Sequence, residues 1–286
     1  MYDGLTLKTK ILILITALLF ILCIVFSFDR KQEKSIVSEL LPQSLSQEIA
    51  SIKIFYDSKE VQIKKLNGEF FLFNSVNDER YKVKDEKIKN VFTALATKNK
   101  MTAISKNSFA QLKDEIKFVM RDKNEKIISE IIFARPDVLG VHRFIKFANG
   151  TIYKALDIYT DTVQVAASYW IERQIFKNVL PNADIQSIAL ADKTLIRNDA
   201  NGKNFIDFEN SLRSFQVLDI FTQALEIAKN NCIDTTKRLR ITFGNRKTIQ
   251  LECTKLESGD YLIFSSLHGV HYLASSYAVE KLFAVK

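Results

Sequence analysis

The chain has little glycine and little proline, with eight and three of them among 286 residues. It has no Pro/Gly-rich tract and no low-complexity run, and 47% of its residues are hydrophobic, so its composition is not that of a disordered segment. Few glycines leave few places where backbone amides could cradle a phosphate, and neither a Gly-rich phosphate loop nor a G-x-S-x-G elbow occurs. We therefore expect one large folded domain or two of ordinary size.

Cysteine and histidine are also scarce, with three of each. Cys23 lies in an apolar N-terminal run, and Cys232 and Cys253 could pair in an oxidising compartment, although two separate core thiols are the simpler interpretation. His268 and His271 form an H-x-x-H, but on a strand or hairpin this spacing does not aim both rings at one point. The sequence therefore predicts no metal, no cofactor and no catalytic residue, and we do not expect an enzyme.

Basic residues exceed acidic ones, 41 against 33, which gives a formal net charge of +8. Such an excess could favour anionic lipid headgroups or acidic polymers. The charges of the two signs are interspersed rather than clustered, so an ordinary solvated surface is the simpler interpretation. We expect no nucleic-acid partner, and no feature of the sequence favours a small-molecule ligand.

An uncharged run, ILILITALLFILCIVFSF, extends from Ile11 to Phe28 with basic residues on both sides. As a helix rising about 1.5 Å per residue it would be about 27 Å long, close to the thickness of a bilayer's hydrocarbon core. The sequence predicts a single spanning helix that anchors the chain in a lipid bilayer. The predicted anchor residues are Ile11, Leu12, Ile13, Leu14, Leu18, Leu19, Phe20, Ile21, Leu22, Ile24, Val25, Phe26 and Phe28.

This run could be a cleaved signal peptide, a lipoprotein signal processed at Cys23, or an uncleaved signal anchor. No small-x-small cleavage site follows it, and Leu22 stands where a lipoprotein signal needs a small residue, so the anchor is favoured. Basic residues on both sides leave the orientation undecided by the positive-inside rule. The layout of a short N-terminus, one span and a long domain favours an N-terminus in the cytoplasm and a translocated C-terminal part.

Beyond a polar linker at residues 29–50, alternating apolar residues predict strands from Ile52 onward, with a hairpin turn at Asn67-Gly68. A helix is predicted from Asp85, because Ile88, Val91, Phe92 and Leu95 recur at spacings of three and four. Further strands are expected at residues 116–120 and 127–133, followed by a hairpin over residues 143–156.

A closing helix is predicted over residues 161–176, and it contains the only tryptophan of the chain. Trp170 is most simply a core residue or an anchor between units, and a stacking platform for a ligand is the alternative. Glu172 and Arg173 form a charged pair in an otherwise apolar segment. We interpret them as a helix-surface or capping feature, and take Trp170, Glu172 and Arg173 together as the candidate partner contact.

The remainder of the chain repeats this order, which indicates an internal duplication. Residues 185–190 correspond to 52–56, Asn201-Gly202 to Asn67-Gly68, and a helix over 214–230 to the helix after Asp85. Two later hairpins and a helix over 276–283 complete the parallel. We therefore predict an α+β fold: an N-terminal transmembrane helix followed by two duplicated units of mainly antiparallel sheet with packed helices. The predicted divisions are residues 1–28 (cytoplasmic tip and anchor), 29–50 (linker), 51–180 (first unit) and 181–286 (second unit).

The anchor, the segment IKIFYDSKEVQIKKLNGEFFLF, the helix from Asp85 and the segment YWIERQIF resemble a bacterial membrane-anchored domain of unknown function, the 4340 series. Genes for this domain often lie beside those of gliding-motility-type ABC transporters. The resemblance covers most of residues 1–180, although the chain has fewer loop glycines than that family, with only Val138-Leu139-Gly140 where more would be expected. It implies an extracytoplasmic accessory or scaffold protein of the bacterial cytoplasmic (inner) membrane that partners ABC-type transporter subunits. It supplies no catalytic residue.

These observations lead to the hypothesis of an interaction protein. Its anchor would fix the two units at the outer face of the membrane, where they would bind transporter or envelope components. The rival hypothesis is an envelope ligand-binding protein or an enzyme that uses the groove between the units. A cell-division or wall-assembly scaffold differs from the first hypothesis only in its partner.

Overall fold

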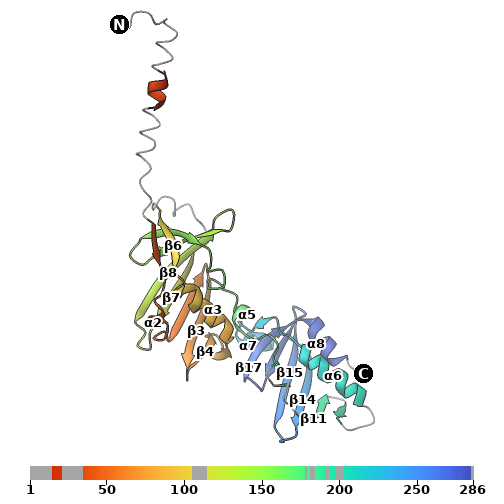
Figure 1. Cartoon of the computed structure of the whole chain (residues 1–286). Coiled ribbons are helices and arrows are strands. Elements are labelled where there is room, and N and C mark those ends of the chain that lie inside the picture. The colour runs from red at the N-terminus through yellow and green to blue at the C-terminus, as the bar shows by residue number, and fades with distance from the viewer. Residues whose placement is uncertain are drawn as a thin grey trace, which may run out of the picture.

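The computed structural model contains two antiparallel β-sheets, one built from the first part of the chain and one from the second (Figure 1). The first sheet has ten strands in the order β1-β6-β10-β9-β8-β7-β2-β3-β4-β5, and the second has seven in the order β12-β11-β14-β15-β16-β17-β13. The structure describes residues 15–20, 35–104, 115–177, 179–180, 184–190, 193–197 and 202–284.

The strands of the first sheet are β1 (Ser35–Ser38), β2 (Ser51–Tyr56), β3 (Lys59–Leu66), β4 (Glu69–Asn74), β5 (Glu79–Lys82), β6 (Asn99–Ala103), β7 (Ile116–Arg121), β8 (Ile127–Pro136), β9 (His142–Phe147) and β10 (Ile152–Leu156). Those of the second are β11 (Ile185–Leu190), β12 (Thr194–Ile196), β13 (Asp219–Ile220), β14 (Cys232–Phe243), β15 (Thr248–Leu256), β16 (Tyr261–Ser265) and β17 (Val270–Ala274). The helices are α2 (Gln43–Ser46), α3 (Asp85–Ala96), α5 (Ala167–Trp170), α6 (Gly202–Ser214), α7 (Leu225–Asn230) and α8 (Ser276–Phe283).

Local sequence accounts for several of these elements. Asn67 and Gly68 both have positive φ, 51° and 88°, and join Leu66 to Glu69 in the tight turn between β3 and β4. Helix α3 buries Ile88, Val91 and Leu95 along one stripe, so the predicted helix from Asp85 is confirmed.

The predicted α+β class is wrong, because the described chain is mostly antiparallel β-sheet with a few short helices. The expected helix over residues 161–176 is reduced to Ala167–Trp170, since the backbone there bonds elsewhere: Lys84 N–H donates to Trp170 O, and Ile171 forms an isolated bridge with Val83. The helix predicted over residues 214–230 is also wrong. This range contains β13 and the short α7, and the long helix of the second unit, α6, comes before it. Gly202 begins α6 rather than turning a hairpin, because Phe205, Phe208 and Leu212 repeat at helical spacing and are buried.

The expected membrane-spanning helix is also corrected. No helix among the described residues is long and apolar enough to cross a membrane. Residues 15–20, which include Leu18, Leu19 and Phe20, are helical. The other predicted anchor residues lie outside the described ones. The structure therefore gives no support to a single-pass protein of the inner membrane.

Seven strands of the first sheet follow the same order as the seven strands of the second. The run β6-β10-β9-β8-β7-β2-β3 matches β13-β17-β16-β15-β14-β11-β12 position by position along the chain. A helix, α3 or α6, also stands at the same point of each series. The first sheet adds β1 at one end and β4 with β5 at the other. The predicted boundary between residues 180 and 181 stays a prediction.

One hydrophobic core extends through both sheets. It includes Ile52 and Phe118 of the first sheet, Trp170 of the connecting segment, and Ile241 and Ile263 of the second sheet, all fully buried. Because the core is continuous across the junction, the two sheets are fixed by packing as well as by the hydrogen bonds described next.

Candidate functional site

The two sheets meet where β5 of the first approaches β17 of the second. Glu79 on β5 is buried, and its Oε1 accepts hydrogen bonds from the backbone N–H of His271 at 2.9 Å and pairs with the ring Nδ1 of His271 at 2.6 Å. One buried carboxylate on the first sheet therefore holds both the backbone and the ring of one residue on the second.

Tyr81, two residues along β5, points the same way. Its hydroxyl lies 2.5 Å from Glu79 Oε2 and 2.5 Å from the backbone oxygen of His271, and its single proton can be donated to either. Its ring stands edge-on to Tyr272 at 5.4 Å between centroids. Burial, then the hydrogen bond and charge of Glu79, raise the pKa of Tyr81 well above its usual range, so the phenol stays protonated.

Two asparagines secure a second part of the junction. The amide of buried Asn74 donates to the backbone oxygen of Phe221 at 2.7 Å, and that of Asn77 donates to Gln223 O at 2.9 Å. Asn77 Oδ1 in turn accepts from the N–H of Leu225, the first residue of α7. These bonds satisfy backbone groups of the second unit with side chains of the first, which fixes their relative position.

A groove of about 360 Å³ lies at this junction. Its lining comes from both sides, with Tyr81 and Lys84 from the first sheet and its continuation, and His268 and Tyr272 from the second. The connecting segment contributes Ile171, Glu172, Gln174, Ile175, Lys177 and Val179. Three stretches of chain that are distant in sequence therefore line the groove.

Charges of both signs surround this groove. Glu172 accepts a hydrogen bond from Lys177 Nζ at 2.9 Å and another from the N–H of Gln174 at 3.2 Å. Burial of Glu172 raises its pKa, but these two hydrogen bonds and the positive charges of Lys84 and Lys177 outweigh burial and lower the pKa below its usual value. Glu172 is therefore an anion at neutral pH.

His268 and Tyr272 form the side of the groove that belongs to the second sheet. The hydroxyl of Tyr272 lies 3.1 Å from His268 Nδ1. His268 as a whole is exposed, yet its ring lies among groove atoms, and this partial desolvation lowers its pKa. A neutral imidazole and a protonated phenol give the groove hydrogen-bonding groups without added charge.

The three residues predicted as a partner contact lie in different surroundings. Trp170 is fully buried and donates from its indole to Gln164 O at 3.0 Å, so it is a core residue. Arg173 donates to Val217 O at 2.8 Å and thereby joins the connecting segment to the second unit. Glu172 alone lines the groove.

The rings of His268 and His271, the H-x-x-H pair, have separate partners, Tyr272 and Glu79. Among the described residues no group of three His, Cys, Asp or Glu side chains could hold a metal ion. Cys232 and Cys253 are both free thiols. The sequence analysis missed Glu79 and Tyr81. Their only local pattern is an acidic residue two positions before an aromatic residue, which places both on the same face of one strand.

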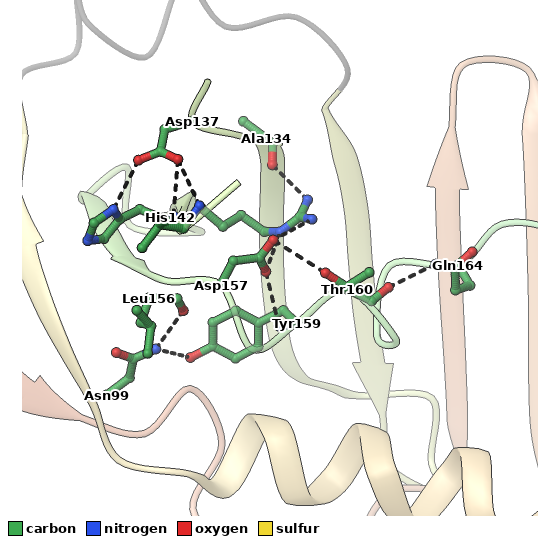
Figure 2. A network of polar contacts seen from close by, with 11 residues as sticks. Asn99, Ala134, Asp137, His142, Leu156, Asp157, Tyr159, Thr160 and Gln164 are labelled. Atoms are coloured by element: carbon green, nitrogen blue, oxygen red, sulfur yellow. Dashed lines mark hydrogen bonds and ion pairs between the residues drawn. The ribbon is translucent and has the colours of Figure 1, made fainter. Parts of the chain in front are cut away.

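A second polar network, drawn in Figure 2, lies in the first sheet and the segment after β10, and none of its labelled residues lines the groove. Buried Arg143 makes two hydrogen bonds to Asp157, at 2.9 and 3.0 Å, and a third to Ala134 O at 3.0 Å. Asp157 also accepts from the N–H of Tyr159 at 3.1 Å. These groups satisfy one another, so we assign the network to structure rather than to binding.

Comparison with family models, curated proteins and solved structures finds no match to this chain. The resemblance to a transporter-linked domain therefore stays a prediction, and the function is argued from the geometry alone.

Proposed function

We propose that this chain is a binding or scaffold protein that holds a partner in the groove between its two sheets. The observation that carries the proposal is the groove itself, about 360 Å³ and lined from both sheets. Its walls are fixed by the buried contacts of Glu79 and Tyr81 with His271, so the surface is formed before a partner arrives. A preformed surface binds without the cost of ordering its side chains.

The lining supports a polar macromolecular partner. Small-molecule pockets are predominantly apolar and enclose most of their ligand. This groove instead carries Lys84, Glu172 and Lys177 together with the hydrogen-bonding groups of His268 and Tyr272. A polar segment of a protein that brings charges of both signs suits such a lining, because charge complementarity sets orientation and excludes wrong partners.

ABC-type transporter subunits are the partner class that the family resemblance implies, and we keep them as the proposed partner. The lining of the groove supports contact with a protein surface of mixed charge, and it does not favour one such protein over another.

A second candidate is a ligand-binding protein that takes a polar polymer into the same groove. The observation that favours it is the pair formed by Tyr272 and His268, whose hydroxyl and imidazole meet at 3.1 Å on the groove wall and can hydrogen-bond to hydroxyl-rich chains.

Co-purification of the full-length chain with ABC-type transporter subunits from its own host tests the first candidate. The variants are Lys84→Glu and Lys177→Glu in the groove, with Lys123→Glu, an exposed lysine in the turn between β7 and β8, as the matched control. We expect the wild type and the control to recover the subunits and both groove variants to lose them. Equal recovery with all four chains would exclude the groove as the contact.

Failure to recover the subunits with any chain would overturn the partner class. Co-sedimentation of the same four chains with insoluble cell-wall polysaccharide then tests the second candidate. Loss of sedimentation in the two groove variants alone would place a polymer in the groove.

A further inference from the structure

The turn between β8 and β9 holds two apolar side chains in solvent. Val138 is 103% exposed and Leu139 is 84% exposed, the two highest values among the exposed large hydrophobic residues of the described chain. We call these two residues the apolar finger. Leaving both in water is unfavourable, so their exposure at a rigid turn points to a surface that covers them in an assembly.

The finger is held in place by Asp137 (Figure 2). One oxygen of this carboxylate accepts from the N–H of Val141 at 2.9 Å and from that of His142 at 3.3 Å, and the other lies 3.0 Å from His142 Nδ1. The N–H of Gly140 donates back to Asp137 O at 2.8 Å, and Gly140 has a φ of 69°, which glycine adopts without strain. The turn is therefore formed before any contact is made.

The base of the finger is anchored as firmly as its tip. Pro136 on β8 pairs with Arg143 on β9, and the buried guanidinium of Arg143 is bound by Asp157 just beyond β10. The hairpin is thus tied to the body of the first sheet. A finger on such a base loses little conformational entropy on binding.

The charges beside the finger are basic on balance. Arg135 is exposed directly before the turn, and Lys154 Nζ lies 3.6 Å from Asp137. The charges of Asp137 and Lys154 offset each other, so the exposed Arg135 is the charge that leaves the surface beside the finger positive. The surface that covers the finger should therefore offer an apolar hollow with an acidic rim.

The second unit carries a hollow of about 440 Å³ whose lining mixes apolar and acidic residues with the uncharged polar residues Thr222, Gln223, Asn231 and Ser258. Its lining includes the buried side chains of Phe221, Ala228 and Leu256, and the exposed Glu257 and half-buried Asp260 lie at the turn between β15 and β16. We call it the acidic hollow. The apolar residues of the lining form a small cluster of their own beside the main core.

We propose that the apolar finger of one copy of this chain inserts into the acidic hollow of a second copy. Within one chain the two do not meet, because Val138 and Leu139 are exposed to solvent. The finger belongs to the first sheet and the hollow to the second, so the contact joins unlike surfaces. The copy that inserts its finger keeps a free hollow, and the copy that receives it keeps a free finger. Repeated from copy to copy, such a contact builds rings or open chains, and exchanged reciprocally between two copies it closes a two-fold dimer.

The contact is small, so the association is concentration-dependent and reversible. Two side chains in one hollow bury far less than the roughly 1,200 Å² of a stable interface. An assembly of this kind would carry one junction groove for each copy. The inference rests on the finger and the hollow alone, and it stands whether or not the groove binds a partner.

Sedimentation velocity of the full-length chain in a mild detergent, over a range of concentrations, tests the proposal. Leu139→Asp should weaken self-association at least about tenfold, since burial of one leucine accounts for a factor of that size. The matched control is Ile127→Asp, which places the same charge on a residue that is 46% exposed at the other end of β8. We expect this control to associate like the wild type.

A charge exchange gives a second, independent measurement. Arg135→Glu and Glu257→Lys should each weaken association, and the double variant should recover most of the loss, because the two opposite charges are then restored across the contact. Equal association of the wild type and Leu139→Asp, or no recovery in the double variant, would overturn the proposal. A third outcome would also overturn it: Leu139→Asp abolishes binding to vesicles of anionic phospholipid but leaves self-association unchanged. In that case lipid, and not a second copy, would cover the finger.

Discussion

The carboxylate of Glu79 on β5 holds His271 of the other sheet at two atoms, the backbone N–H at 2.9 Å and the ring Nδ1 at 2.6 Å. Its second oxygen lies 2.5 Å from the hydroxyl of Tyr81. Both oxygens of this buried carboxylate are thus engaged at the junction. The junction should consequently be more sensitive to the charge of Glu79 than to that of any surface acid.

Glu79→Gln should lower the free energy of unfolding by about 1–3 kcal/mol, because an amide has one acceptor oxygen in place of two and lacks the negative charge that strengthens the hydrogen bond from the N–H of His271. Urea denaturation followed by circular dichroism measures the change. Glu69→Gln is the control, since Glu69 forms an exposed ion pair with Lys82 at 2.6 Å and its loss should cost at most about 1 kcal/mol. Equal losses in the two variants would show that Glu79 has no special role at the junction.

Glu172 should make the groove sensitive to acid. Its pKa is lowered in the folded chain, so its ionised form stabilises the fold above the pKa of the unfolded state, near 4.5. That contribution is lost as the pH falls through the lower folded pKa. Glu172→Gln should therefore flatten the decline in stability below about pH 5, measured by urea denaturation at several pH values. Glu48→Gln, which removes an exposed carboxyl after α2, should leave the decline as steep as in the wild type.

Local features of the fold were predictable from the sequence where a short pattern decides the structure. Asn67-Gly68 forms its turn because both residues take positive φ, and α3 forms because its apolar stripe covers the sheet. The segment over 161–176 was predicted as a helix and is not one, because its backbone bonds to Lys84 and Val83 of the first sheet. Tertiary hydrogen bonds of this kind leave no trace in local periodicity.

The junction could not be predicted for a related reason. Glu79 and His271 are separated by 192 positions, and neither lies in a motif that predicts a contact with the other. The sequence did place a groove between two units as a rival hypothesis, and a groove is present there. The sequence also favoured a core position for Trp170, which is fully buried, but it could not indicate that Glu172, two residues later, faces the groove.

The buried ion pair of Arg143 and Asp157 should be a strong determinant of stability (Figure 2). Their side chains are 7% and 4% exposed, so removing one charge leaves the other without a counter-ion in a dry environment. Asp157→Asn should cost about 3–5 kcal/mol. Glu130→Gln, which breaks the solvent-accessible pair of the half-buried Glu130 with the exposed Lys117 side chain, should cost at most about 1 kcal/mol. Urea denaturation distinguishes the two, and similar midpoints for both variants would contradict the structure.

The two cysteines of the second unit should differ sharply in reactivity. Cys253 is fully buried, and its burial raises the pKa of the thiol to about 12, so almost no thiolate forms at pH 8. Cys232 is only partly buried, and its thiol donates to Ala228 O. Because alkylation requires both access and thiolate, iodoacetamide should label Cys232 of the native chain at least about a hundredfold faster than Cys253, as peptide mass spectrometry would measure. In concentrated urea both should react at similar rates, since unfolding removes the burial that protects Cys253. Equal labelling of the native chain would mean that β14 and β15 open readily, whereas a peptide containing both residues joined by a disulfide would contradict their separate positions.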